Sequence, residues 1–430
     1  MAGIALTPAV AQRSSGDDNS FARSATTVAP VQGRGFRIDG TLSTLYDTNI
    51  LRLGGSRLVT RPGEKKGDVR FSPSVSAAYG MPIGRQQIFI GGLVGRDFYA
   101  QDTRLNRNRY VIGGGANLRA GRSCSGSLNG EYQRRQSLLS ELSDFSGSNV
   151  QQTQVYAAAI ECAPPVGIGF GGGATRRIVD NADVRRSLFD LRQNSFDAHA
   201  NLGAGRIGQF SIGGSYSTID YPLRLVTVAG GTDSDGLDIY SGFIGYSRPI
   251  GTRLSLSLQG SYNRANPKPK TIQQVITIFD VPIGTIPIDR KGYSGGGYSA
   301  VITYRPSTRL TTDISASRSV NNSSNVGALY SVTDLIGAEV SYALRPSLTA
   351  GFGGSYINRK YRGSFSSGTE PIARNSDRNE RVYGRLSYSP TALYDVDFEV
   401  GHERRKSDPV IYSYSSTTAR LTLHVRFGRG

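Results

Sequence analysis

The sequence predicts an all-β chain that forms a single transmembrane antiparallel up-and-down β-barrel of about 18 strands, within a range of roughly 16 to 18. A short phrase recurs along the chain: an alternating run ends in tyrosine, a Pro/Gly turn follows, and a second alternating run begins. Short connections also alternate with long ones. Because Tyr favours the membrane–water boundary, the recurring tyrosines predict an aromatic girdle at the periplasmic surface, where the chain makes its short turns. They are Tyr79, Tyr246, Tyr304, Tyr342 and Tyr388.

The predicted strands follow one another along residues 36–427, and no shift in composition marks a second domain. Each strand is an alternating run bounded by turn residues, chiefly Gly, Pro, Asn, Asp and Ser. The predicted ranges are 36–47, 69–79, 86–99, 108–120, 124–136, 150–162, 166–178, 194–204, 208–221, 238–248, 252–263, 292–305, 308–319, 329–343, 347–358, 379–389, 393–404 and 411–427.

The connections alternate between long and short, beginning and ending with a long one. Outer-membrane barrels have short periplasmic turns and long extracellular loops, so both termini are predicted to be periplasmic and the strand number even. One of the segments predicted to be a long loop is LRLVTVAGGTDSDG at 223–236. The largest predicted loop, 264–291, contains VITIFDVPIGTIPI at 275–288, which indicates an extra hairpin.

Residues 1–11 are interpreted as the remnant of a signal peptide, because Ala-Val-Ala at 9–11 resembles a signal-peptidase site. A ragged terminus is the alternative. Residues 12–35 are polar and predict a flexible periplasmic tail, and residues 36–427 form the predicted outer-membrane barrel.

Two-sided alternation is clearest in the last strands. Successive strand residues face opposite sides, so one face of 394–403 is apolar and the other is acidic. Apolar residues toward lipid and charged residues toward water give a barrel. A soluble β-sandwich or a solenoid, with the apolar side inward, is the alternative, because alternation alone does not tell inside from outside. The apolar face carries Tyr394, Val396, Phe398 and Val400, and the acidic face carries Asp395, Asp397, Glu399 and Glu403.

A ladder of lumen-facing charges is the candidate functional site. We expect the turn at 389–392 to place Arg385 near Asp397. One interpretation is a set of ion pairs that stiffens the wall. The other is a transverse field that orients polar or charged solutes, as rows of charge do in channels. The ladder consists of Asp395, Asp397, Glu399, Arg381, Arg385, Arg420 and Arg426.

Two cysteines are present, Cys124 and Cys162. Each lies beside a predicted short turn, at the same end of neighbouring antiparallel strands and on the same face. Facing positions on paired strands bring Cβ atoms to about 4.5–5.5 Å, which is close to the disulfide range. Because the periplasm is oxidising, we predict a disulfide. The alternative is a pair of unbonded, buried small residues.

No motif predicts catalysis, and we expect no catalytic residue, cofactor or metal. The histidines are His199, His402 and His424, and none lies in a zinc-protease pattern. The net charge of +17 suits lipopolysaccharide phosphate or an anionic polymer. No nucleic-acid module is present, so nucleic acid is not an expected partner.

Three early segments resemble the putative β-barrel porin 2 family of Gram-negative outer-membrane proteins. They are LYDTNILR at 45–52, GDVRFSPSVSAAYG at 67–80 and RDFYAQDTRLNRNRY at 96–110. Some members of that family are similar to products of exopolysaccharide loci, so the resemblance implies polymer export. It also implies the barrel-assembly machinery, outer-membrane lipid and lipopolysaccharide as partners. Barrels of this class usually end on an aromatic residue, whereas Phe427 here is followed by Gly428-Arg429-Gly430.

The expected function is a porin-like passage for polar solutes or a surface polysaccharide such as an exopolysaccharide. The alternative is a plugged structural or adhesive barrel whose basic loops bind surface polysaccharide, and an outer-membrane enzyme is a remote third. The loop 264–291 discriminates the first two, because an inward fold would plug the pore and a projecting fold would bind.

Overall fold

The computed structural model describes residues 33–54, 66–137, 149–164, 166–204, 207–278, 281–323, 328–363 and 375–429. Within them, the main sheet contains 18 antiparallel strands, and two further strands form a separate hairpin. The strands are β1 Gly35–Asp47, β2 Asp68–Ile83, β3 Gln86–Tyr99, β4 Arg107–Ala120, β5 Cys124–Gln136, β6 Val150–Cys162, β7 Val166–Asn181, β8 Leu191–Ala204, β9 Gln209–Val228, β10 Gly231–Ile250, β11 Leu254–Lys268, β12 Thr271–Ile278, β13 Val281–Asp289, β14 Tyr293–Tyr304, β15 Leu310–Asn322, β16 Tyr330–Arg345, β17 Leu348–Arg362, β18 Ser376–Tyr388, β19 Tyr394–Asp408 and β20 Tyr414–Arg429.

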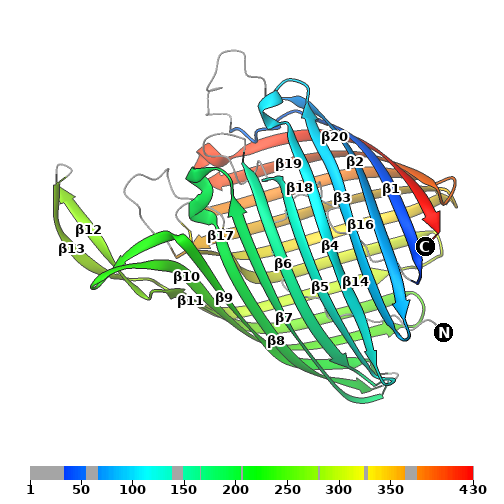
Figure 1. Cartoon of the computed structure of the whole chain (residues 1–430), viewed down its shortest axis with the longest axis horizontal. Helices are drawn as coiled ribbons and strands as arrows, with labels where there is room; N and C mark the ends of the chain where they lie inside the picture. The colour runs from blue at the N-terminus through cyan, green and yellow to red at the C-terminus, as the bar shows by residue number, and fades with distance from the viewer. Residues whose placement is uncertain are drawn as a thin grey trace.

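The sheet closes on itself, because β1 pairs with both β2 and β20. Phe36 of β1 lies opposite Arg429 of β20, so the ring closes with both ends of the barrel segment on the same side. We call this side the short-turn end and the opposite side the long-loop end (Figure 1). The predicted fold, a closed antiparallel all-β barrel, is therefore confirmed, and the β-sandwich alternative is excluded.

The faces of the wall have the sense of a membrane barrel. Large apolar side chains such as Val94, Ile212 and Phe352 are exposed on the outside, whereas polar residues such as Ser72 and Thr422 are buried on the inside. A soluble protein would bury the apolar face instead. Each strand therefore presents an apolar outer face and a polar lumen face.

Two short turns share the phrase Pro-Ile-Gly, at 82–84 and 249–251. Gly84 and Gly251 both have φ of +61°, the left-handed region that glycine adopts without steric cost. The glycines therefore allow the chain to reverse within a few residues, and the strands continue through Pro82 and Pro249 up to the turn.

The segment 223–236, predicted as a loop, is mostly strand. Pairing between β9 and β10 continues out to Val228 opposite Gly231, with a register shift between Ser234 and Asp235. Leu223 and Leu225 are exposed within this extension, which keeps the alternation of the strand before it. The Gly and Asp residues that indicated a loop occupy the turn and the bulge.

The extra hairpin predicted at 275–288 is confirmed as β12 and β13, which pair from Thr271 opposite Asp289. It projects beyond the long-loop end, away from the barrel (Figure 1). The largest loop therefore does not fold back into the lumen through this hairpin.

The connections that the structure describes include the short 3-10 helices η2 Thr103–Leu105, η3 Val184–Phe189 and η5 Val410–Tyr412. In the described ranges, no helix has the length and apolar character needed to cross a membrane. The predicted signal-peptide remnant and almost all of the predicted amino-terminal tail lie outside the described residues.

Candidate functional site

The predicted charge ladder lies on the lumen face of β18, β19 and β20. In β19, Asp395, Asp397 and Glu399 alternate with Phe398 and the other exposed apolar residues. On the two neighbouring strands, the exposed Val382 of β18 and Leu421 of β20 mark the outer face. The ladder arginines of these strands occupy the alternate positions, so they lie on the lumen face. All seven residues of the ladder therefore share the lumen wall. They are Asp395, Asp397, Glu399, Arg381, Arg385, Arg420 and Arg426.

Ion pairs join the ladder across neighbouring strands. Arg381 Nη2 lies 2.9 Å from Glu399 Oε1, and Arg426 Nη2 lies 2.7 Å from Asp395 Oδ1. Arg420 lies opposite Glu399 in the register of β19 and β20 and is buried. Both interpretations of the ladder need such pairs, since they stiffen the wall and also fix the position of each charge.

Arg385 does not meet Asp397 as expected. In the register of β18 and β19, Arg385 lies opposite Glu399, and Ser387 lies opposite Asp397 and donates a hydrogen bond to it. The register of β18 and β19 therefore differs from the expected one by two residues.

The partner of Arg385 is Glu339 of β16, which sequence reasoning missed. Arg385 Nη2 lies 2.6 Å from Glu339 Oε1, and Tyr383 Oη donates to Glu339 Oε2 at 2.7 Å. The alternation around Glu339 in β16 could have placed it on the lumen face. A contact that reaches across β17 could not be read from neighbouring strands alone.

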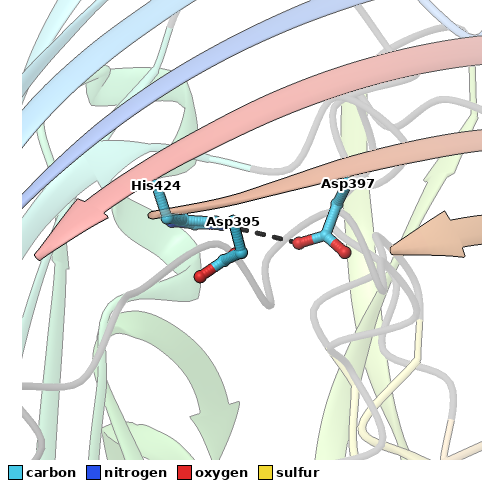
Figure 2. Close-up of side chains that lie close together, drawn as sticks. All are labelled: Asp395, Asp397 and His424. Atoms are coloured by element: carbon cyan, nitrogen blue, oxygen red, sulfur yellow. Dashed lines mark ion pairs between the residues drawn. The ribbon is translucent and has the colours of Figure 1, made fainter. Parts of the chain in front are cut away.

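Asp395, Asp397 and His424 bring three groups of the metal-ligand type together, with ligand atoms all within 4.8 Å (Figure 2). His424 Nε2 lies 3.8 Å from Asp397 Oδ2, and Nδ1 shares a hydrogen bond with Thr41 Oγ1 at 3.0 Å. Arg426 already neutralises Asp395. The Arg426 guanidinium would repel a metal cation bound to Asp395. We therefore assign Asp395, Asp397 and His424 to the ion-pair network of the wall.

The lumen face of β6 and β8 carries a second polar group. His199 Nε2 lies 2.8 Å from Glu161 Oε2, and Asn201 Nδ2 donates to Glu161 Oε1 at 2.8 Å. Asp197 lies 3.8 Å from the other ring nitrogen of His199. Gly171 of β7 gives these side chains room, since a Cβ there would overlap the Glu161 carboxylate. The lumen thus has charged groups on two separate parts of its wall.

At the long-loop end, apolar side chains of β7–β11 and β14–β16 form one buried cluster that includes Ile219, Leu237 and Leu329. Tyr221 Oη of β9 donates to the carbonyl oxygen of Ser323, just after β15, at 3.3 Å. β10, β11 and β14 lie between these strands in the sheet, so the contact crosses part of the lumen. The packed cluster narrows the mouth on this side.

A buried triad of charges lies in the same part of the mouth. Asp235 contacts Arg224 Nε at 2.7 Å and Arg290 Nη2 at 2.6 Å, and all three side chains are 1% exposed or less. The Arg224 guanidinium also stacks on Tyr221, 3.7 Å from the ring centroid. One carboxylate between two guanidiniums ties the β9–β10 hairpin to Arg290, the residue that directly follows β13.

The segment LYDTNILR lies at the rim of the mouth, on the other side from the buried triad. Asp47 accepts a hydrogen bond from the backbone of Asn49 and pairs with Arg52 at 2.7 Å. Asn49 Nδ2 donates to the carbonyl of Ser415, and Arg52 lies over the Tyr414 ring. Burial lowers the pKa of Arg52 and Asp47 raises it, with a net rise, so the guanidinium is charged. These motif residues therefore hold the rim where β1 meets β20.

The five predicted girdle tyrosines lie on the outer face near the short-turn end. Tyr246 is half-buried, donates to the Ile207 carbonyl at 2.8 Å and lies 4.9 Å from the Phe210 ring, centroid to centroid. Their position suits the predicted girdle, which remains a prediction. The exposed members are Tyr79, Tyr304, Tyr342 and Tyr388.

Cys124 and Cys162 face each other across β5 and β6 at the short-turn end. Their Cα atoms are 4.0 Å apart, and the structure joins the two sulfur atoms. The bond encloses the whole β5–β6 hairpin, since the two residues are 38 positions apart in sequence.

A closed antiparallel barrel of 18 strands, apolar outside and charged within, defines the class of outer-membrane β-barrels. Residues 291–427, from just before β14 into β20, match the family model of putative β-barrel porin 2. The match confirms the family resemblance, although it lies outside 45–110, where the resembling segments occur. No curated protein matches the chain.

Three solved structures illustrate the likeness of fold. OpdL of Pseudomonas aeruginosa is 11% identical, with 92% of this chain and 99% of that chain covered and a TM-score of 0.43. OccAB3 of Acinetobacter baumannii is 10% identical, with 92% and 99% covered and a TM-score of 0.46. The alcaligin outer membrane receptor FauA of Bordetella pertussis is 11% identical, with 93% and 77% covered and a TM-score of 0.42.

Proposed function

We propose that the protein is a porin-like passage for polar solutes across the Gram-negative outer membrane. The observation that carries the proposal is the exposure of three charged side chains of the ladder in the lumen. Arg426, Arg385 and Asp397 are 54%, 36% and 34% exposed, although each faces the inside of the barrel. Side chains that line a dry core would not retain this exposure.

The width of the barrel supports the same function. Barrels of about 16–18 strands leave an aqueous channel unless loops or side chains fill it. The hairpin β12–β13 projects away from the lumen, so it does not act as a plug (Figure 1). The ion pairs of β16 and β18–β20 create local fields that orient a polar solute along the wall.

The proposal includes the orientation of the barrel in the membrane and the route by which the chain is exported to it. The long-loop end faces the exterior and the termini face the periplasm, as short-turn and long-loop geometry indicates. Export through a signal peptide, of which residues 1–11 are a remnant, and insertion by the barrel-assembly machinery complete it. The proposed solutes are polar molecules, either neutral or charged. A surface polysaccharide is a polymer of such units.

A second candidate is a barrel whose mouth is closed and whose loops bind surface polysaccharide. The observation that favours it is the buried cluster at the mouth, with Asp235 between Arg224 and Arg290. This cluster occupies one side of the mouth. Whether the remaining space conducts is the question that separates the two candidates.

Liposome swelling with hexose-sized solutes tests the passage. Proteoliposomes that contain the refolded protein are expected to swell in galactose, galacturonate and galactosamine, faster than protein-free liposomes. Variant Gly171→Leu adds a side chain that overlaps the Glu161 carboxylate and His199, and it should slow swelling. The control Gly242→Leu adds the same side chain on the outer face of β10, where a Cβ meets no atom within 4 Å. Failure to swell with a correctly folded barrel would favour the closed candidate.

A further inference from the structure

A group of cationic side chains lies on the outer face of the barrel, at the long-loop end of β17–β19. Their even positions share the face of the exposed apolar residues Phe352, Val382 and Phe398, so they point away from the lumen. All are exposed. We call Lys360, Arg362, Arg378, Arg404 and Lys406 the cationic patch.

The strand register sets these residues side by side. Arg378 lies opposite Lys406. Arg404 lies two residues from Lys406 toward the short-turn end, and it faces Glu380. Lys360 lies opposite Ser376, one outward position from Arg378. Facing residues on paired strands have Cβ atoms about 4.5–5.5 Å apart, so the patch concentrates like charges within the reach of one or two anionic groups.

The inward-facing Arg405, at the same level as the patch, has a carboxylate partner. Arg405 lies 3.6 Å from Asp377 and is buried. In the described part of the chain, no residue of the patch forms an ion pair within 4.0 Å. Among the described residues, the outer face has three acidic residues near the patch, of which Asp334 of β16, diagonal to Lys360, pairs with Arg318. Glu380 faces Arg404 without pairing, and Asp408 accepts a hydrogen bond from Asn375.

The patch lies just above the apolar band of the outer face. Toward the short-turn end, one outward polar residue in each strand follows the patch, Asn358, Glu380 or His402. The outward residues after these are apolar and exposed: Tyr356 in β17, Val382 in β18 and Val400 in β19. Charged side chains are costly within hydrocarbon, so the patch belongs at head-group level. Adjacent like charges destabilise a sheet unless anions neutralise them.

We propose that the cationic patch binds the phosphate groups of lipopolysaccharide in the outer leaflet. The inference follows from charge complementarity and from the height of the patch above the apolar band. Phosphates offer several acceptor oxygens to Arg side chains, often in a bidentate manner. The proposal rests on the orientation given above, with the long-loop end outward, and it is independent of solute passage through the lumen.

The test measures binding of diphosphoryl lipid A in mixed detergent micelles by native mass spectrometry. The patch variant replaces Lys360, Arg378, Arg404 and Lys406 with Gln. The matched control replaces Arg253, Arg305, Arg309 and Arg345, four exposed arginines in short turns at the other end, with Gln. Both variants lose the same charge, and heat-modifiable gel mobility verifies that each is folded.

The wild type and the control are expected to bind diphosphoryl lipid A, and the patch variant at least tenfold more weakly. Lipid A stripped of its phosphates should bind none of the three above background. Equal binding by the wild type and the patch variant would overturn the proposal, as would equal binding of the dephosphorylated lipid. Binding of an anionic polysaccharide, but not of lipid A, would also overturn it. If the fourfold variant does not fold, Arg378→Gln with Arg404→Gln provides the same comparison.

Discussion

At the scale of single residues, the lumen wall depends on contacts that reach beyond adjacent strands. Glu339 accepts hydrogen bonds from Arg385 and Tyr383, and the two donors lie on β18, two strands away. Tyr383 fits because Gly353 of β17 has no side chain, and a Cβ there would overlap the Tyr383 ring. A glycine in the intervening strand thus allows a network to form across it.

Loss of Arg385 should change ion selectivity. Arg385→Gln leaves the Glu339 carboxylate in the hydrated lumen without its guanidinium partner. We expect the permeability ratio of cation to anion to rise about twofold or more, because charged rows govern selectivity in pores. The reversal potential of the reconstituted protein in a salt gradient measures this.

Arg309→Gln is the matched control, since Arg309 is exposed in a turn at the short-turn end. The same shift in both variants would mean that total charge, and not the position of Arg385, sets the selectivity.

The buried triad at the mouth should be sensitive to a neutral substitution. Asp235→Asn removes the negative charge that Arg224 and Arg290 both contact. Breaking such a buried pair costs about 3–5 kcal/mol, so unfolding in urea should begin at a lower concentration. The β9–β10 extension should also become more open to limited proteolysis.

Asp233→Asn is the control, because Asp233 is exposed two residues away on the same hairpin. Equal stability of the two variants would show that the triad does not hold the mouth together.

At the scale of secondary-structure elements, the disulfide links the short-turn ends of β5 and β6. In the chain-entropy account, a bond that closes a loop of this length stabilises the fold by about 2–4 kcal/mol. Cys124→Ser with Cys162→Ser should lower the temperature at which the barrel loses heat-modifiable mobility, without changing conductance. Non-reducing peptide mapping provides the direct check, and free thiols in the oxidised protein would contradict the bond.

Strand order and bounds followed from alternation because each wall residue faces either lipid or lumen. This pattern located β5 and β6 at Cys124–Gln136 and Val150–Cys162, as predicted. It failed at 223–236, where Gly and Asp residues indicated a loop and the strands continue past the membrane band. Composition there reflects exposure to water, which a protruding hairpin shares with a loop.

The candidate site was only partly predictable for a related reason. The alternation of inward and outward positions placed all seven ladder residues on the lumen face, because it depends only on position along one strand. The partner of Arg385 depends on strand tilt and on the small Gly353 between the two strands, and neither is visible in local alternation. Contacts across the mouth, such as Tyr221 with Ser323, require the closed shape of the whole barrel.

At the scale of the whole molecule, the lumen has two zones. The long-loop zone is packed with apolar side chains and buried charges, and the short-turn zone carries exposed charges. The outer surface is also zoned, with tyrosines near one end and the cationic patch at the other. This arrangement suits a passage that is narrower at the long-loop end than at the short-turn end.

The projecting hairpin should be dispensable for the passage. Arg290 N donates to the Lys270 carbonyl at 2.8 Å, so a short Gly-Ser linker can replace residues 271–289 without moving β11 or β14. Folding and single-channel conductance should both be unchanged. A marked increase in conductance after the deletion would show that this hairpin enters the lumen.

Single-channel conductance of the refolded protein in planar bilayers tests the central claim most directly. A salt gradient across the bilayer gives ion selectivity in the same experiment. The account predicts stepwise openings with weak selectivity, since lumen acids and arginines are largely paired. Absence of openings from a protein whose heat-modifiable mobility proves it folded would contradict the passage and leave the closed, polysaccharide-binding barrel.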